Sequence, residues 1–108
     1  MVELLDGVFH ALADGTRRAM VAELAAGERS VSELAAPHPI SLAAASKHVT
    51  VLERAGIVVR QKVGRRQVCR LQAAPLAAAT AHLRHYERFW NTRLEALEAL
   101  VTDPEERP

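Results

Sequence analysis

Apolar residues recur at helical spacing along most of the chain. In the first twelve positions the pattern is carried by Leu4, Leu5, Val8, Phe9 and Leu12. This spacing predicts an amphipathic helix over residues 2–12. Residues 14–16 interrupt the pattern, and a second apolar repeat that ends before Gly27 predicts a helix over residues 16–26. The first quarter of the chain is therefore expected to form two short helices.

Capping signals mark two further helices that follow closely in the sequence. Ser30 and Glu33 have the spacing of a capping box, which predicts a short helix that ends at Ala36, before two prolines. A longer helix is predicted over residues 41–55, because a serine stands at its start and Gly56 follows its end. Its expected buried stripe consists of Leu42, Ala45, Val49 and Leu52. A short helix, a tight turn and a longer helix are the parts of a helix-turn-helix.

After Gly56 the pattern becomes typical of strands. β-branched residues at 57–59 and a second run at 67–71 flank Gly64, and this arrangement predicts a two-stranded antiparallel hairpin. An isolated hairpin is only marginally stable, so it must pack on the helices and leave its tip, residues 63–66, free. We interpret a free basic tip beside a DNA-reading helix as a wing.

No glycine or proline interrupts the chain between Pro75 and Thr102, which predicts a long final helix that starts at this proline. Its apolar stripe is too long for so small a core to bury, and a second copy of the chain could cover it by two-fold symmetry. The expected dimer contacts, with help from the first helix, are Leu5, Phe9, Leu83, Tyr86, Trp90, Leu94, Leu97 and Val101. The alternative is a final helix folded over its own domain.

Together these elements predict a mainly α fold with a β-hairpin wing, a winged helix-turn-helix of about five helices and two antiparallel strands. The 108 residues fit one domain, expected over residues 1–102, with a disordered tail over 103–108. No apolar run approaches the roughly 20 residues that span a bilayer. The first lysine or arginine is Arg17, so no basic leader is expected either. We therefore expect a cytoplasmic protein without membrane contact.

Charge is strongly segregated along the chain, although its net value is only +1. Residues 41–70 hold seven basic residues and one acidic residue, whereas the rest holds seven basic and twelve acidic residues. A basic middle between acidic ends is typical of a phosphate-binding surface, and double-stranded DNA is the expected partner. The expected DNA contacts are short, hydroxyl-bearing or cationic side chains that can approach base edges and phosphates. They are Ser41, Ala43, Ala44, Ser46, Lys47, His48, Thr50, Arg54, Lys62, Arg65 and Arg66.

Other chemistry has little support in the sequence. A single cysteine, Cys69, excludes an intrachain disulfide and a multi-thiolate metal site, and we expect it to be a small buried apolar residue. The chain has no glycine-rich phosphate loop and no nucleophile elbow, so an enzyme is not expected. A winged helix used only for protein–protein contact is an alternative, but the basic helix and tip favour DNA.

Two stretches resemble the ArsR family of bacterial winged-helix repressors. They are FHALADGTRR at residues 9–18 and SKHVTVLERAGIV at residues 46–58. The resemblance implies a dimeric transcriptional repressor that binds inverted repeats in promoters, and members of this family often respond to metals. The segment FWNTRL at residues 89–94 further resembles a branch that lacks the metal-binding motifs.

Where metal sensors of this family carry ligands, this chain carries other residues. Ser30-Val31-Ser32 replaces a Cys-Val-Cys motif, and the acid-x-His pair of the final helix becomes Thr80-x-His82, with Arg93 and Ala96 at the two later ligand positions. We therefore expect no metal and no cofactor, and DNA binding that metals do not change. A metal-responsive repressor with an inter-subunit site at His82 and His85 remains an alternative, as does an unidentified small-molecule effector. Leu42 also replaces a glutamine found in many members at the start of the reading helix, so base contacts cannot be copied from relatives.

Overall fold

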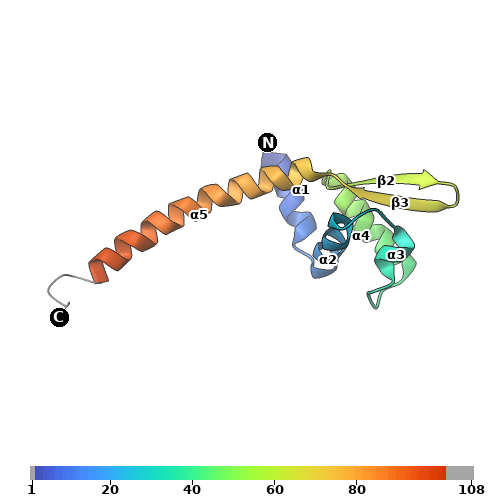
Figure 1. The fold of residues 1–108 in the computed structure, drawn as a ribbon, viewed down its shortest axis with the longest axis horizontal. Coiled ribbons are helices and arrows are strands. Elements are labelled where there is room, and N and C mark those ends of the chain that lie inside the picture. The colour runs from blue at the N-terminus through green and yellow to red at the C-terminus, as the bar shows by residue number, and fades with distance from the viewer. Residues whose placement is uncertain (1, 102–108) are drawn as a thin grey trace.

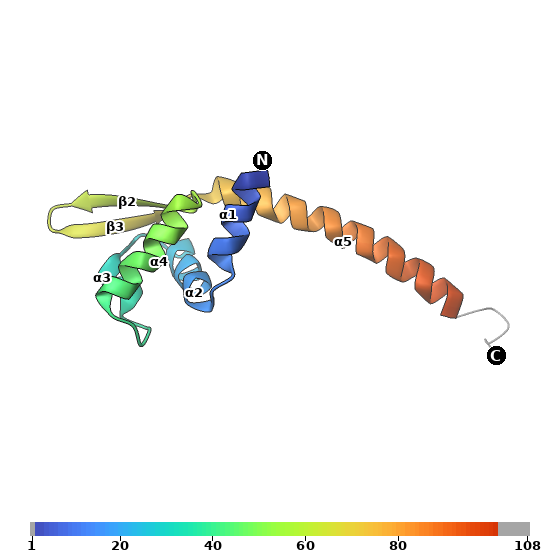
Figure 2. The same ribbon diagram turned by 180° about the vertical axis from the view of Figure 1, so that it is seen from behind.

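The computed structural model describes residues 2–101, which form five helices and three strands (Figure 1). In chain order these are α1 (Val2–Leu12), α2 (Gly15–Ala25), β1 (Arg29–Ser30), α3 (Val31–Ala35), α4 (Leu42–Arg54), β2 (Val58–Val63), β3 (Arg66–Leu71) and α5 (Ala73–Val101). The hairpin β2–β3 leaves the helical body α1–α4 on one side, and α5 leaves it on the other (Figures 1 and 2). The winged helix-turn-helix fold is confirmed. The expected tail lies outside the described residues.

Local capping sets the ends of the helices as the sequence predicts. The Ser30 hydroxyl accepts from the Glu33 backbone N–H at 3.1 Å, and the Glu33 carboxylate accepts from the Ser30 N–H at 2.9 Å, so the capping box of α3 is complete. The Ser41 hydroxyl accepts from the Ala44 N–H at 3.1 Å and caps α4. Gly56 follows α4 with φ +78°, a conformation that only glycine adopts without strain. The second helix starts at Gly15, one residue early, because Asp14 is its N-cap.

The sheet has three strands where two were expected. β1 pairs antiparallel with β3, Arg29 opposite Cys69 and Ser30 opposite Val68, which gives the order β1-β3-β2. The expected hairpin β2–β3 is confirmed, and only the expected number of two strands is wrong. With only two residues, β1 is too short to show alternation in the sequence, and its pairing partner lies about forty residues away. This strand ties the start of the helix-turn-helix to the middle of β3.

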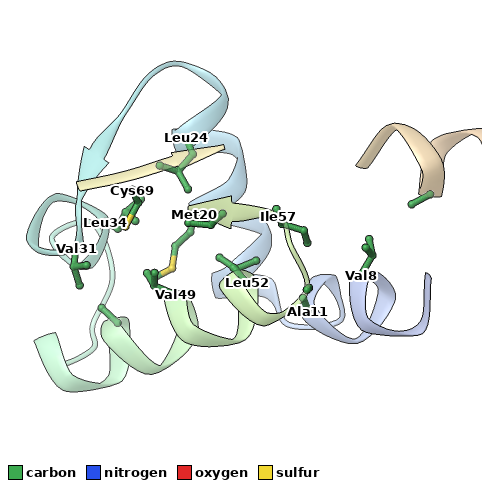
Figure 3. Close-up of a cluster of buried hydrophobic side chains, with 14 residues drawn as sticks. Val8, Ala11, Met20, Leu24, Val31, Leu34, Val49, Leu52, Ile57 and Cys69 are labelled. Atoms are coloured by element: carbon green, nitrogen blue, oxygen red, sulfur yellow. The ribbon is translucent and has the colours of Figure 1, made fainter. Parts of the chain in front are cut away.

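One hydrophobic core joins the four body helices to the sheet (Figure 3). Its labelled members are Val8, Ala11, Met20, Leu24, Val31, Leu34, Val49, Leu52, Ile57 and Cys69. The expectation that Cys69 is buried is confirmed, and burial raises the pKa of its thiol. The expectation that Leu42 belongs to the stripe is wrong, since 57% of its surface is exposed. Leu42 occupies the first position of α4, so it lies beyond the core that buries Ala45 one turn later.

The final helix is long and touches the body only near its start. It begins at Ala73, two residues before Pro75, and the proline sits in the first turn, where its missing N–H costs no hydrogen bond. Ala79 is the one buried residue of α5, and the rest of the helix runs away from the body (Figures 1 and 2). The alternative of a helix folded over its own domain is therefore not what this chain does. Within residues 2–101, neither α5 nor another helix is both long and apolar enough to cross a membrane.

Two leucines of α4 provide a test of this packing. We expect Leu52→Ala to lower the free energy of unfolding by about 3 kcal/mol, because the substitution leaves a cavity at a fully buried position. Leu42→Ala on the same helix should change it by less than about 0.5 kcal/mol, because that side chain is mostly solvated. Urea unfolding followed by circular dichroism measures both values. Equal losses for the two variants would contradict the packing described.

Candidate nucleic-acid interface

The amino-terminal half of α4 and the tip of the wing border a groove of about 540 Å³. Its walls come from residues 30–32 at the start of α3, from Leu42, Ala43 and Ser46 of α4, and from residues 65–67 of the wing. The groove thus lies between the two elements that the sequence assigns to DNA. Its walls combine the apolar side chains of Val31 and Leu42 with serine hydroxyls and two arginines. The hydroxyls and arginines can bind phosphate oxygens.

The expected DNA contacts fall into two groups in the structure. The first group is exposed: Ser41, Ala43, Lys47, Arg54, Lys62, Arg65 and Arg66. Four of these cations have no hydrogen-bond or ion-pair partner among residues 2–101: Lys47, Arg54, Lys62 and Arg65. A long cationic side chain without an internal partner is available to a phosphate. The second group is half-buried and consists of Ala44, Ser46, His48 and Thr50.

Arg66 is exposed but already paired. Its Nη2 donates to the Glu33 carboxylate at 2.5 Å, and the same oxygen accepts from the Ser30 N–H. Hydrogen bonds from Ser30, together with the charge of Arg66, hold the pKa of Glu33 below its usual value. Arg66 therefore links the wing tip to α3, and its charge is partly neutralised.

Ser46 and Thr50 face Arg60, a neighbour inside the molecule that was not expected from the sequence. Arg60 of β2 donates from Nη1 to Ser46 Oγ at 2.9 Å and from Nη2 to Thr50 Oγ1 at 2.7 Å. It also donates to the Glu53 carboxylate at 3.0 Å and to the Gln67 amide oxygen at 3.1 Å. In the sequence, Arg60 is one of the seven basic residues of the segment 41–70. Arg60 pairs with the buried Cys69, so the two side chains lie on the same face of the sheet. The alternation of side chains along β2 was the signal in the sequence that could have indicated this.

His48 lies against the junction of α1 and α2. Its Nδ1 is 3.3 Å from Arg17 Nη1 and 4.0 Å from Asp14 Oδ2. Arg17 also donates from Nε to the Ala11 carbonyl at 2.6 Å, so it satisfies the carboxyl end of α1. The backbone N–H of Arg17 holds the pKa of Asp14 below its usual value, helped by the charges of Arg17 and His48. His48 thus docks α4 on the first two helices, a contact that the sequence did not indicate.

The two histidines of α5 belong to an aromatic group. The His82 ring lies 6.3 Å from the Phe9 ring and 5.0 Å from the Tyr86 ring, and His85 lies 6.1 Å from Tyr86. Among residues 2–101, no three His, Cys, Asp or Glu side chains gather closely enough to hold a metal ion. These contacts place His82 at the junction of α1 and α5.

Most of the expected dimer contacts form an exposed apolar stripe on α5. Tyr86 is 49% exposed and Trp90 is 59% exposed, and the other members on α5 are at least half exposed: Leu83, Leu94, Leu97 and Val101. Leu5 and Phe9 of α1 are half-buried and pack against the chain's own core. The free part of the expected interface is therefore carried by α5.

Comparisons with known proteins agree with this arrangement. A family model described as a helix-turn-helix domain matches residues 12–61. The HTH-type transcriptional regulator Rv2034 of Mycobacterium tuberculosis strain H37Rv is 42% identical over 96 residues, which cover 89% of this chain and 87% of that protein. An ArsR-like transcriptional regulator from Rhodococcus sp. RHA1 is 33% identical with a TM-score of 0.73, and the match covers 95% of this chain and 96% of that one.

A further solved structure bears on assembly. It is a homodimeric winged helix-turn-helix DNA-binding domain from Mycobacterium bovis, described as a possible ArsR-family transcriptional regulator. It is 29% identical to this chain with a TM-score of 0.65, and the match covers 81% of each chain.

Proposed function

The chain belongs to the ArsR family of winged helix-turn-helix transcriptional regulators, and from this premise we propose that it is a homodimeric repressor that binds an inverted-repeat operator. The observation that carries the proposal is the position of the unpartnered cations. Lys47 on α4 and Arg65 at the wing tip are exposed on the two elements that border the groove. A dimer seated on a promoter would block RNA polymerase, which is the physical basis for repression.

The two elements would divide the work of binding. The exposed face of α4 would enter the major groove, where the small side chains Ser41, Ala43 and Ala44 let the helix approach the base edges. The wing would follow the backbone, and Arg65 and Lys62 would contact phosphates or an adjacent minor groove. The DNA strand between these two contacts would pass along the protein groove between α4 and the wing tip.

The apolar stripe of α5 supports the homodimer. With 29 residues, α5 is about 43 Å long, and a stripe of large apolar side chains along most of that length is far more than a monomer usually exposes. Two antiparallel or crossed copies of the helix would cover the stripe by two-fold symmetry. The homodimeric relative from Mycobacterium bovis has the same fold and supports the same assembly here.

The operator is expected to have the symmetry of the protein. Two reading helices related by a dyad meet successive major grooves roughly 34 Å apart, so each half-site should be repeated in inverted orientation. A gel shift with DNA from upstream of the chain's own gene, followed by hydroxyl-radical footprinting, tests this expectation. Protection of one asymmetric half-site would contradict the dimer on DNA, and equal affinity for random DNA would contradict specific binding.

Trp90 is expected to anchor the dimer. Because a buried tryptophan contributes much of the energy of an interface, Trp90→Ala should weaken dimerisation by about 2 kcal/mol or more, roughly thirtyfold in Kd. Arg88→Ala is the matched control, since Arg88 lies about 200° around α5 from Trp90 and should leave Kd unchanged. Sedimentation equilibrium of both variants measures the effect. A wild-type chain that remains monomeric at micromolar concentration would overturn the interface.

Arg65 is expected to contribute to DNA affinity without distinguishing between base sequences. Arg65→Ala should weaken binding to operator and random DNA alike and lower the slope of log K against log salt by about 1 per subunit, because one phosphate contact is lost. Arg84→Ala removes a cation from α5, on the other side of the body from the wing, and serves as the control (Figure 1). Fluorescence anisotropy over a range of salt gives both slopes. If Arg65→Ala retains the affinity and the slope of the wild type, the wing tip does not contact DNA.

A further inference from the structure

The side chain of Arg60 connects the wing to the facing side of α4 with a fork of hydrogen bonds. It is 15% exposed, and it reaches Ser46, Thr50 and Glu53 on three successive turns of the helix. Its Nη1 also holds the Gln67 amide oxygen on β3. A planar guanidinium can make these contacts at once because its donors have a fixed geometry. Arg60 is thus engaged inside the protein, unlike Arg65.

This fork makes the two hydroxyls of α4 chemically different. A hydroxyl has one proton to donate and two lone pairs to accept. The proton of Thr50 goes to the Ser46 carbonyl at 3.0 Å, and its oxygen accepts from Arg60, so Thr50 has no donor left. The oxygen of Ser46 also accepts from Arg60, but among residues 2–101 its proton has no acceptor. Ser46 lines the groove, where that proton can be donated outward.

We propose that Arg60 is a positioning residue that fixes Ser46 as a hydrogen-bond donor toward DNA. This proposal rests on the proposed function, because it specifies what the reading helix recognises. In the major groove, guanine, adenine and thymine present acceptors, whereas cytosine presents only the N4 amino donor. Because Arg60 already donates to one lone pair of Ser46 Oγ and its N–H groups repel a second donor, the Ser46 hydroxyl donates to the first three bases at its position in each half-site and disfavours cytosine.

Selection from a randomised duplex library, read by sequencing, tests this specificity. We expect the wild type to enrich an inverted repeat in which one position per half-site excludes cytosine by about fivefold or more. Ser46→Ala should remove the preference at that position. Arg60→Met should let cytosine rise at the same position, because a freed hydroxyl can rotate to accept from the N4 amino group.

Two further variants test whether the effect of Arg60 depends on the geometry of its hydrogen bonds or only on its charge, and whether any arginine of the hairpin would have the same effect. Arg60→Lys keeps the charge but not the fork, so it should also relax the preference against cytosine. Arg70→Met removes an arginine from β3 opposite Val59, on the other face of the sheet by strand alternation, and should leave the preference intact. Melting curves identify a temperature at which each variant is folded, and all selections are made there.

The possible results are distinguishable. If the wild type enriches no sequence, the proposed function fails and this inference fails with it. If the wild type enriches an inverted repeat, but Arg60→Met and Arg60→Lys keep the same base preferences, the positioning role alone is overturned. A salt slope that falls by about 1 per subunit in Arg60→Met, with unchanged preferences, would identify Arg60 as a phosphate contact instead.

Discussion

The burial of a narrow stripe on α4 is the constraint on which the rest of the structure depends. Ala45, Val49 and Leu52 have no exposed surface, so the rotation of the helix about its own axis is fixed by close packing. Once this face is fixed, Ala43 and Lys47 must face outward, and Ser46 and Thr50 must lie at the boundary. The surface that we propose to contact DNA is therefore a consequence of how the core is packed. A shift of the apolar stripe by one position along the sequence would turn other side chains outward.

Polar contacts hold α4 in place at the edges of this packing. His48 approaches Arg17 on the α1–α2 side, and Arg60 binds Ser46 and Thr50 on the wing side. Because hydrogen bonds are directional, they restrict sliding and tilting of the helix in ways that apolar contacts do not. These contacts also engage arginines within the protein. Arg17, Arg60 and Arg66 all serve internal contacts, so the number of basic residues overstates the charge that is free to meet phosphates.

The final helix differs from the body in how its apolar residues are covered. The body buries its apolar residues within one chain, whereas α5 leaves Trp90 and its neighbours on the stripe uncovered. A chain of 108 residues has too little core to cover a helix of this length. The contact of His82 with Phe9 joins α5 to α1 near the body. A dimer built on this stripe would thus be attached to the body through α1, whose carboxyl end is held by Arg17.

The sequence by itself determined the features that depend on neighbours along the chain. Helix ends were predictable at Ser30, Ser41 and Gly56, because caps and left-handed glycines act within three or four residues. The alternation of apolar and polar residues likewise predicted the helix-turn-helix, the hairpin and the exposed stripe of α5. Tertiary structure decided what distant residues do together. It added β1 by pairing Arg29 with Cys69, left Leu42 outside the core, and turned Arg60 inward to the hydroxyls of α4. No local pattern encodes these contacts, because each depends on which side chains the folded chain brings within a few ångströms of one another.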